Sequence, residues 1–526
     1  MSIHEIYVVS DLHLGGAPKS EGRPSYQMCP PESRRRLARF IEHLRRSQPG
    51  RASAGATLEL VVNGDLVDFL AEPPFEPFTR SPHAAVAKLR QIIRSSDERA
   101  PEGERLFPAL RRLVADGHRL TVLLGNHDLE LALPPVRHEL STYLTGDRPA
   151  SIEFLFDGEA CRRGQALIEH GNRYDGWNAV AHGALRALRA RLSRGEPEFP
   201  FPPPAGSRLV AEVINPLKSL YRFIDLLKPE NEALIPILSA LHPVAVREIR
   251  KVFSAWRATS AARPGEVPDQ ETYIADYDLA GPVPDALTEI ADRGPARDAG
   301  GRPPGMGSPI WDELAGEAVD TGTIRRSQAL LAESEALLAR LAGDPGVVPE
   351  EYSQIGDGTL AWLRSGLSLA RMSRSDDVVR FQHLRDALAS HRRTIGTTFA
   401  LEAEAPAYLD AARRLARDDT RFVIFGHTHL PKSIALDGGG RYINTGTWCR
   451  TIRLDEGLYH AGSNDREALE RLRRFVEDMG ANRLDGWTSL RTPFARLVVG
   501  ADGETTAELC EVHEDGRVSA PMAETA

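Results

Sequence analysis

Histidine, carboxylate and amide side chains recur along this chain in five short clusters that could together form one metal site. The clusters are Asp11–His13, Gly64–Asp68, Gly125–Asp128, His170–Asn172 and Gly426–His429. Imidazole nitrogens and carboxylate or amide oxygens are ligands that first-row transition metals accept. Two divalent cations about 3.5–4 Å apart neutralise a phosphate group and activate a water for in-line attack. The pattern therefore predicts a two-metal hydrolase site.

Each cluster directly follows a run of residues that favours a β-strand. The runs are Glu5–Ser10, Leu58–Asn63, Arg119–Leu124, Ala166–Glu169 and Arg421–Phe425. Open α/β sheets gather their chemistry at the carboxyl ends of the strands. We therefore expect five segments that are distant in the sequence to meet at one edge of a sheet structure.

The five clusters resemble the motifs of the calcineurin-like metallophosphoesterase superfamily, which read D-x-H, G-D-x-x-D, G-N-H-D/E, H and G-H-x-H in this order. Asn444–Trp448 resembles the N-T-G-S/T-W strand of that family. The resemblance covers roughly residues 1–175 and 418–515. It implies an α/β fold, namely an αββα sandwich of two sheets with helices outside. We expect the first motif strands in one sheet and the C-terminal strands, including the hairpin Phe494–Val499 and Thr505–Val512, in the other.

The resemblance also implies the metal ligands. Those of the first metal would be Asp11, His13 and His429. Those of the second would be Asn126, His170 and His427. Asp65 would bridge both ions. This mixed set of nitrogen and oxygen ligands favours Mn²⁺, with Fe or Zn²⁺ as alternatives, over Ca²⁺ or Mg²⁺.

Other motif residues are candidates for work on the substrate. In the family, the histidine at the position of His127 contacts the phosphate and stabilises the transition state or protonates the leaving oxygen, which suits a near-neutral pKa. Asp128 would orient that imidazole, and Asp68 would support a metal ligand or its loop. Asn172 and Arg173 follow a ligand histidine and could line the substrate cleft, where a guanidinium binds phosphate with two hydrogen bonds. The alternative for Arg173 is that it pairs with Asp175 or begins the next helix.

The implied activity is hydrolysis of a phosphodiester or pyrophosphate bond by a metal-bound water or hydroxide, on a small nucleotide-like or lipid-linked substrate. Ser10–Leu14, Gly64–Asp68 and His170–Asn172 look similar to the bacterial branch that includes UDP-2,3-diacylglucosamine pyrophosphatases. This chain departs from that branch at His127, where those enzymes typically have Arg, and in its much larger insertion.

Two other classes of function stay open. The first is a phosphomonoesterase or protein phosphatase, which would need a shallow, exposed site, whereas a large insertion indicates an enclosed one. The second is a non-catalytic interaction scaffold that binds metal, which we would expect to have lost ligands. Comparing the turnover of a diester with that of a monoester separates these classes.

Composition limits the remaining possibilities. With 526 residues, 41% hydrophobic and 26% charged, the chain can form two or three domains. Its net charge of −9 argues against a broad nucleic-acid surface. The four cysteines have no C-x-x-C spacing, which predicts neither disulfides nor a thiolate metal site. We expect a cytoplasmic protein without a transmembrane helix, because the N-terminus starts with a strand and the apolar run Ala233–Val246 is short. Peripheral membrane contact stays open.

The middle of the chain, residues 176–417, is predicted to be a helical cap inserted between the two parts of the core. An amphipathic pattern from Val213 to Lys228 predicts one of its helices. Further helices are expected at 177–194, 245–259, 324–341, 378–394 and 405–416. The Pro- and Gly-rich stretch at about 262–308 predicts a flexible loop. Residues 516–526 are predicted to be a C-terminal tail that is frayed from Ser519 onward.

Overall fold

The computed structural model describes the chain in segments. These are residues 4–16, 26–47, 57–146, 152–196, 201–218, 221–242, 368, 377–459 and 465–522. The predicted helices at 245–259 and 324–341 and the predicted loop at 262–308 lie outside the described residues. None of the described helices is long and apolar enough to cross a bilayer.

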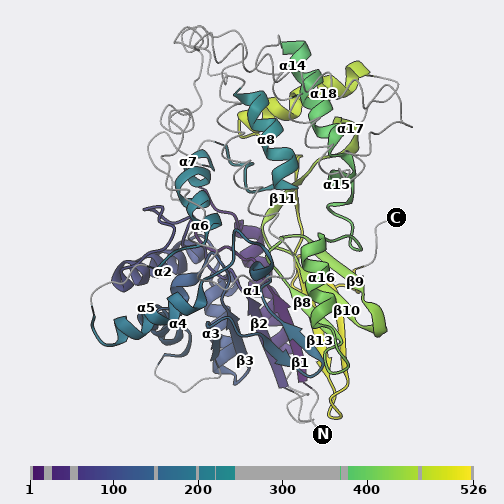
Figure 1. Cartoon of the computed structure of the whole chain (residues 1–526). Helices are drawn as coiled ribbons and strands as arrows, with labels where there is room; N and C mark the ends of the chain where they lie inside the picture. Colours follow the sequence, from purple (N-terminus) through teal and green to yellow (C-terminus); the bar gives the residue numbers. More distant parts are fainter. Residues whose placement is uncertain are drawn as a thin grey trace, which may run out of the picture.

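The first sheet has six strands in the order β14-β13-β1-β2-β3-β4 (Figure 1). Four of them run parallel: β1 (His4–Val9), β2 (Thr57–Asn63), β3 (Arg119–Leu123) and β4 (Ile152–Leu155). The antiparallel hairpin of β13 (Pro493–Val499) and β14 (Thr505–Glu511) pairs with the open edge of β1. Its residues alternate between the faces, so that Phe494 joins the helix-covered core and Leu497 the opposite one.

The second sheet has five strands in the order β5-β6-β8-β10-β9. They are β5 (Cys161–Arg163), β6 (Ala166–Ile168), β8 (Phe422–Phe425), β10 (Arg441–Thr445) and β9 (Pro431–Ala435). Ile6 and Val61 of the first sheet share a buried cluster with Ile168 and Ile424 of the second, so the two sheets pack face to face. The predicted α/β class is confirmed. The prediction that the C-terminal hairpin belongs to the second sheet is wrong, because β13 pairs with β1.

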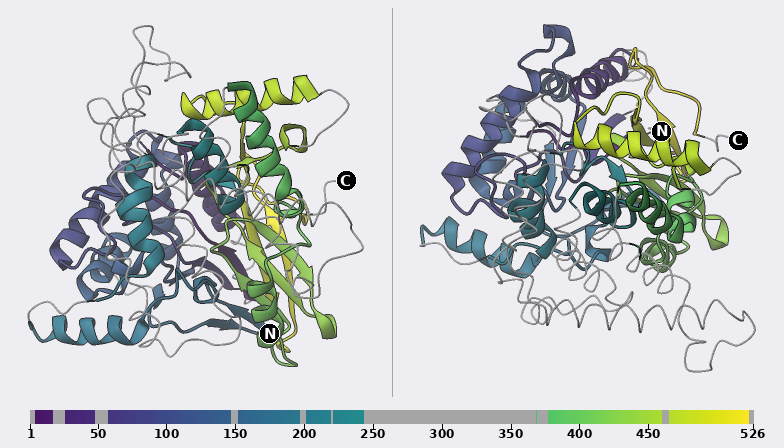
Figure 2. Two further views of the ribbon diagram at one scale, coloured as in Figure 1. Left: turned by 45° about the horizontal axis from the view of Figure 1, so that its top comes forward. Right: turned by 90° about the horizontal axis from the view of Figure 1, so that it is seen from above.

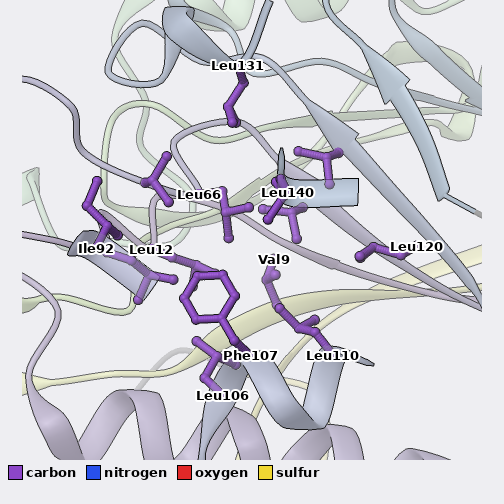
Figure 3. Packing of buried hydrophobic residues seen from close by; sticks show 14 of the residues in the cluster. Val9, Leu12, Leu66, Ile92, Leu106, Phe107, Leu110, Leu120, Leu131 and Leu140 are labelled. Carbon is purple, nitrogen blue, oxygen red and sulfur yellow. The ribbon is translucent and has the colours of Figure 1, made fainter. Parts of the chain in front are cut away.

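Helices cover the outer faces of both sheets. The first sheet packs against α1 (Pro31–Arg46), α2 (Pro82–Asp97), α3 (Leu106–Ala115), α4 (Pro134–Thr145) and α5 (His182–Ser193). Figure 3 shows Phe107 and Leu110 of α3 against Val9 of β1. On the second sheet, Ala411 and Ala412 of α16 (Pro406–Leu415) pack on Phe425.

A second hydrophobic core lies beyond the sandwich (Figures 1 and 2). It includes a small sheet of β12 (Thr488–Leu490), β11 (Arg450–Arg453) and β7 (Leu227–Lys228). Its helices are α8 (Glu230–Leu241), α14 (Asp377–Ser390), α15 (Arg392–Thr397), α17 (Glu456–Tyr459) and α18 (Asp465–Gly480). The second core thus joins elements of the predicted cap with α17 and α18, which the predicted division assigned to the catalytic core.

The predicted single helix from Val213 to Lys228 is not formed. A π-helical turn at Val210–Ile214 follows α6 (Ala205–Leu209) and leads into α7 (Asn215–Lys218), and the chain then turns into β7. Tyr221, Ile224 and Leu227 are nevertheless buried in the second core. Their apolar spacing therefore predicted burial correctly, but turns and a short strand bury these residues, and a helix does not.

The other predicted local features differ in smaller ways. Helix α5 begins only at His182, because Asp175 accepts hydrogen bonds from the preceding Trp177 and Asn178 and holds them in a turn. Near the C-terminus, Ser519 and Met522 donate backbone hydrogen bonds to Glu511 and Leu509. The chain from 519 to 522 is therefore attached to β14 and is not frayed as predicted.

Candidate metal centre

The predicted ligands meet where strands of both sheets end. Residues after β1, β2 and β3 come from the first sheet, and residues after β6 and β8 come from the second. Three overlapping groups have ligand atoms within 4.8 Å of one another: Asp11, His13 and His429; Asp11, Asp65 and His170; and His13, Asp68 and His127. The face-to-face packing of the sheets therefore brings together residues more than 400 positions apart.

The backbone at this centre adopts an unusual conformation. Six described residues other than glycine have a positive φ, and five of them are predicted ligands: Asp11, His13, Asp65, His427 and His429. Such a left-handed conformation costs a bulky residue about 1–3 kcal/mol and persists only where the surroundings enforce it. Its concentration at one edge indicates that the fold holds these side chains in place for a function.

Glycines of the motifs allow the ligands to approach one another. A Cβ atom at Gly64 would lie within 3.0 Å of the His170 ring, and one at Gly125 would overlap the Asp65 carboxylate. At Gly426 it would collide with Ser10 and Asp11. Any side chain at these positions would therefore displace a ligand.

Two histidines and Asp11 form one side of the centre. Nε2 of His13 lies 2.9 Å from Nε2 of His429, which in turn lies 3.3 Å from Oδ1 of Asp11. The backbone N–H of His427 donates to Oδ2 of Asp11 at 2.9 Å, which fixes the carboxylate. Two imidazole nitrogens and a carboxylate oxygen at these distances fit the ligand set of a transition metal.

Asp65 lies between this group and the next one. Its Oδ2 is 3.6 Å from Nε2 of His13 and 3.3 Å from Nε2 of His170. Nδ1 of His170 is 2.8 Å from the carbonyl oxygen of Asn63, which can only accept, so the ring proton is on Nδ1. The buried Nε2 then faces the centre and has no hydrogen-bond partner among the described residues.

Asn126 and His427, the other predicted ligands of the second metal, lie beside this group. The amide nitrogen of Asn126 donates to Oδ1 of Asn178 at 3.3 Å, and its buried Oδ1 has no partner among the described residues. The rings of His427 and His170 are 5.4 Å apart, whereas Nε2 of His427 contacts Asp175 at 3.3 Å. This contact was not predicted, although Asp175 follows His170 closely in the sequence.

The buried ionisable groups of the centre shift one another's pKa values. Burial alone would raise the pKa of Asp65, but the charges of His170 and His127 hold it well below its usual range. Burial likewise opposes ionisation of His170, and Asp65 and Asp11 still raise its pKa to about 9. Burial and the charge of Lys228 lower the pKa of His429 to about 4. Asp65 is therefore ionised although it is buried, whereas burial and the charge of Asp65 raise the pKa of the neighbouring Asp128 to about 8.

His127 is oriented by Asp68 and not by the expected Asp128. Nδ1 of His127 lies 3.1 Å from Oδ1 of Asp68, and the other oxygen of Asp68 lies 3.4 Å from Nδ1 of His13. The carboxylate of Asp128 instead accepts the backbone N–H groups of Leu66 at 2.9 Å and Gly125 at 2.7 Å. Asp128 thus stabilises two loops that carry ligands, while Asp68 links two imidazoles.

Neither predicted substrate-binding residue lines the main cleft. The amide of Asn172 donates to the carbonyl of Asn178 at 2.8 Å. The guanidinium of Arg173 donates to the carbonyl of Gly158 and lies 3.5 Å from the Glu169 carboxylate. Both side chains line a separate small pocket behind the metal centre. The closeness of Asn172 and Arg173 to His170 in the sequence could not predict where their side chains point. Asn172–Tyr174 form a 3₁₀ turn after the left-handed Gly171, which redirects them.

The main cleft has a volume of about 670 Å³ and opens onto the metal centre between the sandwich and the second core. Asp65, Asn126, His127, His427 and His429 line one side. Lys218 and Lys228, which are buried and paired with Asp225 and Glu230, also line the cleft. The sequence pattern placed these two lysines off the apolar face of a helix and did not indicate that they line the same cleft as the ligands.

The buried His and Asp groups are typical of a metal site in an α/β protein, and their overlap offers ligands to more than one ion. Comparison with known proteins finds no family model, no curated protein and no solved structure that matches this chain. The function of the centre is therefore inferred from its own residues.

Proposed function

We propose that this protein is a dinuclear-metal-dependent hydrolase of phosphodiester or pyrophosphate bonds, of the calcineurin-like metallophosphoesterase type. The observation that carries the proposal is the central position of Asp65, whose Oδ2 lies within 3.6 Å of His13 and within 3.3 Å of His170. A carboxylate shared by two imidazole groups suits a bridge between two ions. The two packed sheets, the helices outside them and the order of the five motifs further support this family.

The ligands of the two ions would be those that the motif order implies. Asp11, His13 and His429 would hold one ion, Asn126, His170 and His427 the other, and Asp65 both. Nε2 of His170 and Oδ1 of Asn126, which are buried and lack hydrogen-bond partners among the described residues, fit this role. When bound, two such ions neutralise the charge of a phosphate group and activate a water for in-line attack.

The chain's own acid would be His127. Asp68 contacts Nδ1 of this ring, which leaves Nε2 for the substrate, and the side chain lines the cleft with 15% of its surface exposed. Nε2 could then donate a proton to the leaving oxygen or a hydrogen bond to a phosphoryl oxygen.

The cleft favours a small substrate. Its volume of about 670 Å³ lies in the range of small-molecule sites. Lys218 and Lys228 line the cleft together with their carboxylate partners Asp225 and Glu230, and Ile214, Ile224 and Leu234 add apolar surface. A phosphate group next to an apolar or aromatic moiety matches this lining, which supports a nucleotide-like or lipid-linked substrate.

Metal content and substrate preference test the proposal together. Purified protein should contain close to two divalent ions per chain and hydrolyse bis-p-nitrophenyl phosphate faster than p-nitrophenyl phosphate, with loss of activity on chelation. A matched control is Asp437→Ala, because Asp437 is exposed and outside the cleft. Preference for the monoester would reassign the protein as a phosphomonoesterase. Bound metal without turnover of either ester would support a scaffold.

A further inference from the structure

A second cavity, larger than the cleft, lies between the helices of the first sheet and the second core. It has a volume of about 980 Å³, and none of the candidate metal ligands lines it. Five arginines do so, and we call it the arginine pocket after them: Arg34, Arg35, Arg99, Arg222 and Arg450. Three of them come from α1 and from the segment after α2, and two from the side of the second core.

The arginine pocket carries more positive than negative charge. Its lining has five arginines and three carboxylates, Glu32, Glu98 and Asp485, which leaves an excess of 5 − 3 = 2 positive charges. This excess stands out in a chain with a net charge of −9. An acidic protein that concentrates guanidinium groups around one cavity attracts anions to that place.

Two of these arginines, Arg99 and Arg222, have no carboxylate partner in the part of the chain that the structure describes. Arg450 pairs with Glu32, and the buried Arg34 donates to the Ser96 carbonyl at 2.9 Å. Arg35 donates to the carbonyl of Pro31 at 3.3 Å and interacts with the charge of Glu32. Arg99 and Arg222 are exposed, and neither side chain contacts an acid among the described residues. Their remaining N–H donors are therefore available to a ligand.

The floor of the same pocket is partly apolar. Met28, Leu226 and Leu484 line it, together with the ring of the buried Tyr26. A volume of about 980 Å³ lies at the upper end of the range for sites of small molecules and cofactors. Guanidinium groups that bind phosphate oxygens in pairs, next to an apolar surface, recognise an anionic head that is joined to an aromatic or aliphatic body.

We propose that the arginine pocket is a second binding site, which takes a phosphorylated small molecule independently of the metal centre. The phosphate or pyrophosphate group would lie between Arg99 and Arg222, and the body of the ligand would lie on Met28, Leu226 and Leu484. The pocket adjoins the cleft through a thin partition. Met28 lines both cavities, and the hydroxyl of Tyr26 donates to Asp225, which lines the cleft.

Calorimetric titration of the full chain with ADP, with and without a chelator, tests this site. Binding should persist after the metals are removed and should be competed by inorganic pyrophosphate, because the arginines recognise the phosphates. The variant R99A/R222A should raise the Kd for ADP at least tenfold, since it removes two charge-assisted contacts. The control R46A/R80A removes two exposed arginines outside both cavities and should leave the Kd unchanged.

Each alternative outcome overturns the proposal. Binding that disappears with the metals would place ADP at the metal centre. An equal Kd for R99A/R222A and the parent would remove the arginines from recognition, and so would an equal loss in both double variants. Absence of any ADP binding to the chelated protein would dismiss the site. The near-ultraviolet circular dichroism of R99A/R222A checks that it is folded, and hydrolysis of the diester by the metal-loaded protein tests the proposed activity separately.

Discussion

Asp65 is the residue on which the two-ion proposal depends, because it contacts both histidine groups of the centre. If it bridges the ions, Asp65→Ala should lose both metals and abolish hydrolysis, whereas Asp11→Ala should mainly weaken one site. Elemental analysis of the purified variants measures this, with Asp437→Ala as the control. Two metals retained in Asp65→Ala would contradict a bridging role.

His127 can be separated from the metal ligands by substitution. Its ring lies near His13 and Asp68, so geometry also permits it to bind an ion. As an acid it should not be needed for metal binding, and His127→Ala should keep both ions while kcat falls by about 10²–10⁴. Steady-state kinetics and metal analysis of the same preparation decide between the two roles.

The substrate determines how strongly this variant is affected. A diester with a poor leaving group needs the proton most, so the loss should be larger for it than for a nitrophenyl ester. Loss of one metal in His127→Ala would make His127 a ligand. An unchanged kcat with a poor leaving group would exclude it from the chemistry.

At the scale of elements, a buried ion pair joins the two sheets at the end opposite to the metal centre. Glu59 of β2 accepts hydrogen bonds from Arg163 of β5 at 2.8 Å and from Thr121 of β3 at 2.5 Å, and lies 2.8 Å from Nε2 of His4. Burial by itself would raise the pKa of Glu59. The bonds from His4, Arg163 and Thr121 outweigh burial and lower this pKa from 4.5 to about 2.

This pair makes the stability of the protein depend on pH. Because the folded pKa of Glu59 lies below its ordinary value, its contribution is complete above about pH 4.5 and is lost as the pH falls toward 2. Glu59→Gln should lower the free energy of unfolding by about 3 kcal/mol at pH 7, since it leaves Arg163 without its buried partner. The difference from the parent should shrink at pH 3, as measured by urea unfolding.

An exposed carboxylate provides the control for this effect. Glu470 on α18 is exposed, and Glu470→Gln should change the unfolding free energy by less than about 0.5 kcal/mol at either pH. A difference between Glu59→Gln and the parent that stays constant from pH 7 to pH 3 would show that the charge of Glu59 does not stabilise the packing of the sheets.

At the scale of the whole molecule, the second core should be needed for stability and not for metal binding. Phe475 of α18 is fully buried there, and its ring packs edge-on against Trp487 at 4.9 Å. Phe475→Ala should lower the free energy of unfolding by about 3–5 kcal/mol through lost burial and the resulting cavity. Fluorescence during urea unfolding follows the loss, and Glu470→Ala serves as the control on the same helix.

The metal content of Phe475→Ala then tests the separation of the two cores. No candidate ligand belongs to the second core, so the folded variant should retain its ions below its unfolding transition. A folded variant that has lost them would mean that the second core completes the metal site.

The sequence by itself predicted the candidate ligands, several of which the structure brings together. Asp11, Asp65 and His429 follow strands whose apolar pattern is local, and the neighbouring glycines mark the places where the backbone must turn. Such strands and turns can be predicted without the tertiary structure, because strand periodicity and turn preferences depend on a few consecutive residues. The convergence of these residues at strand ends then follows from the rules of α/β sheets.

Only the tertiary structure decided what the neighbours of these residues do. Asp68 contacts His127 and Asp128 does not, because side-chain directions near left-handed residues depend on packing. Arg173 turns away from the cleft, and Lys218 turns toward it from a segment that is not a continuous helix. The hairpin of β13 and β14 pairs with the open edge of β1 through backbone hydrogen bonds. Every residue type offers these backbone groups, so the sequence does not indicate which strand edge the hairpin joins.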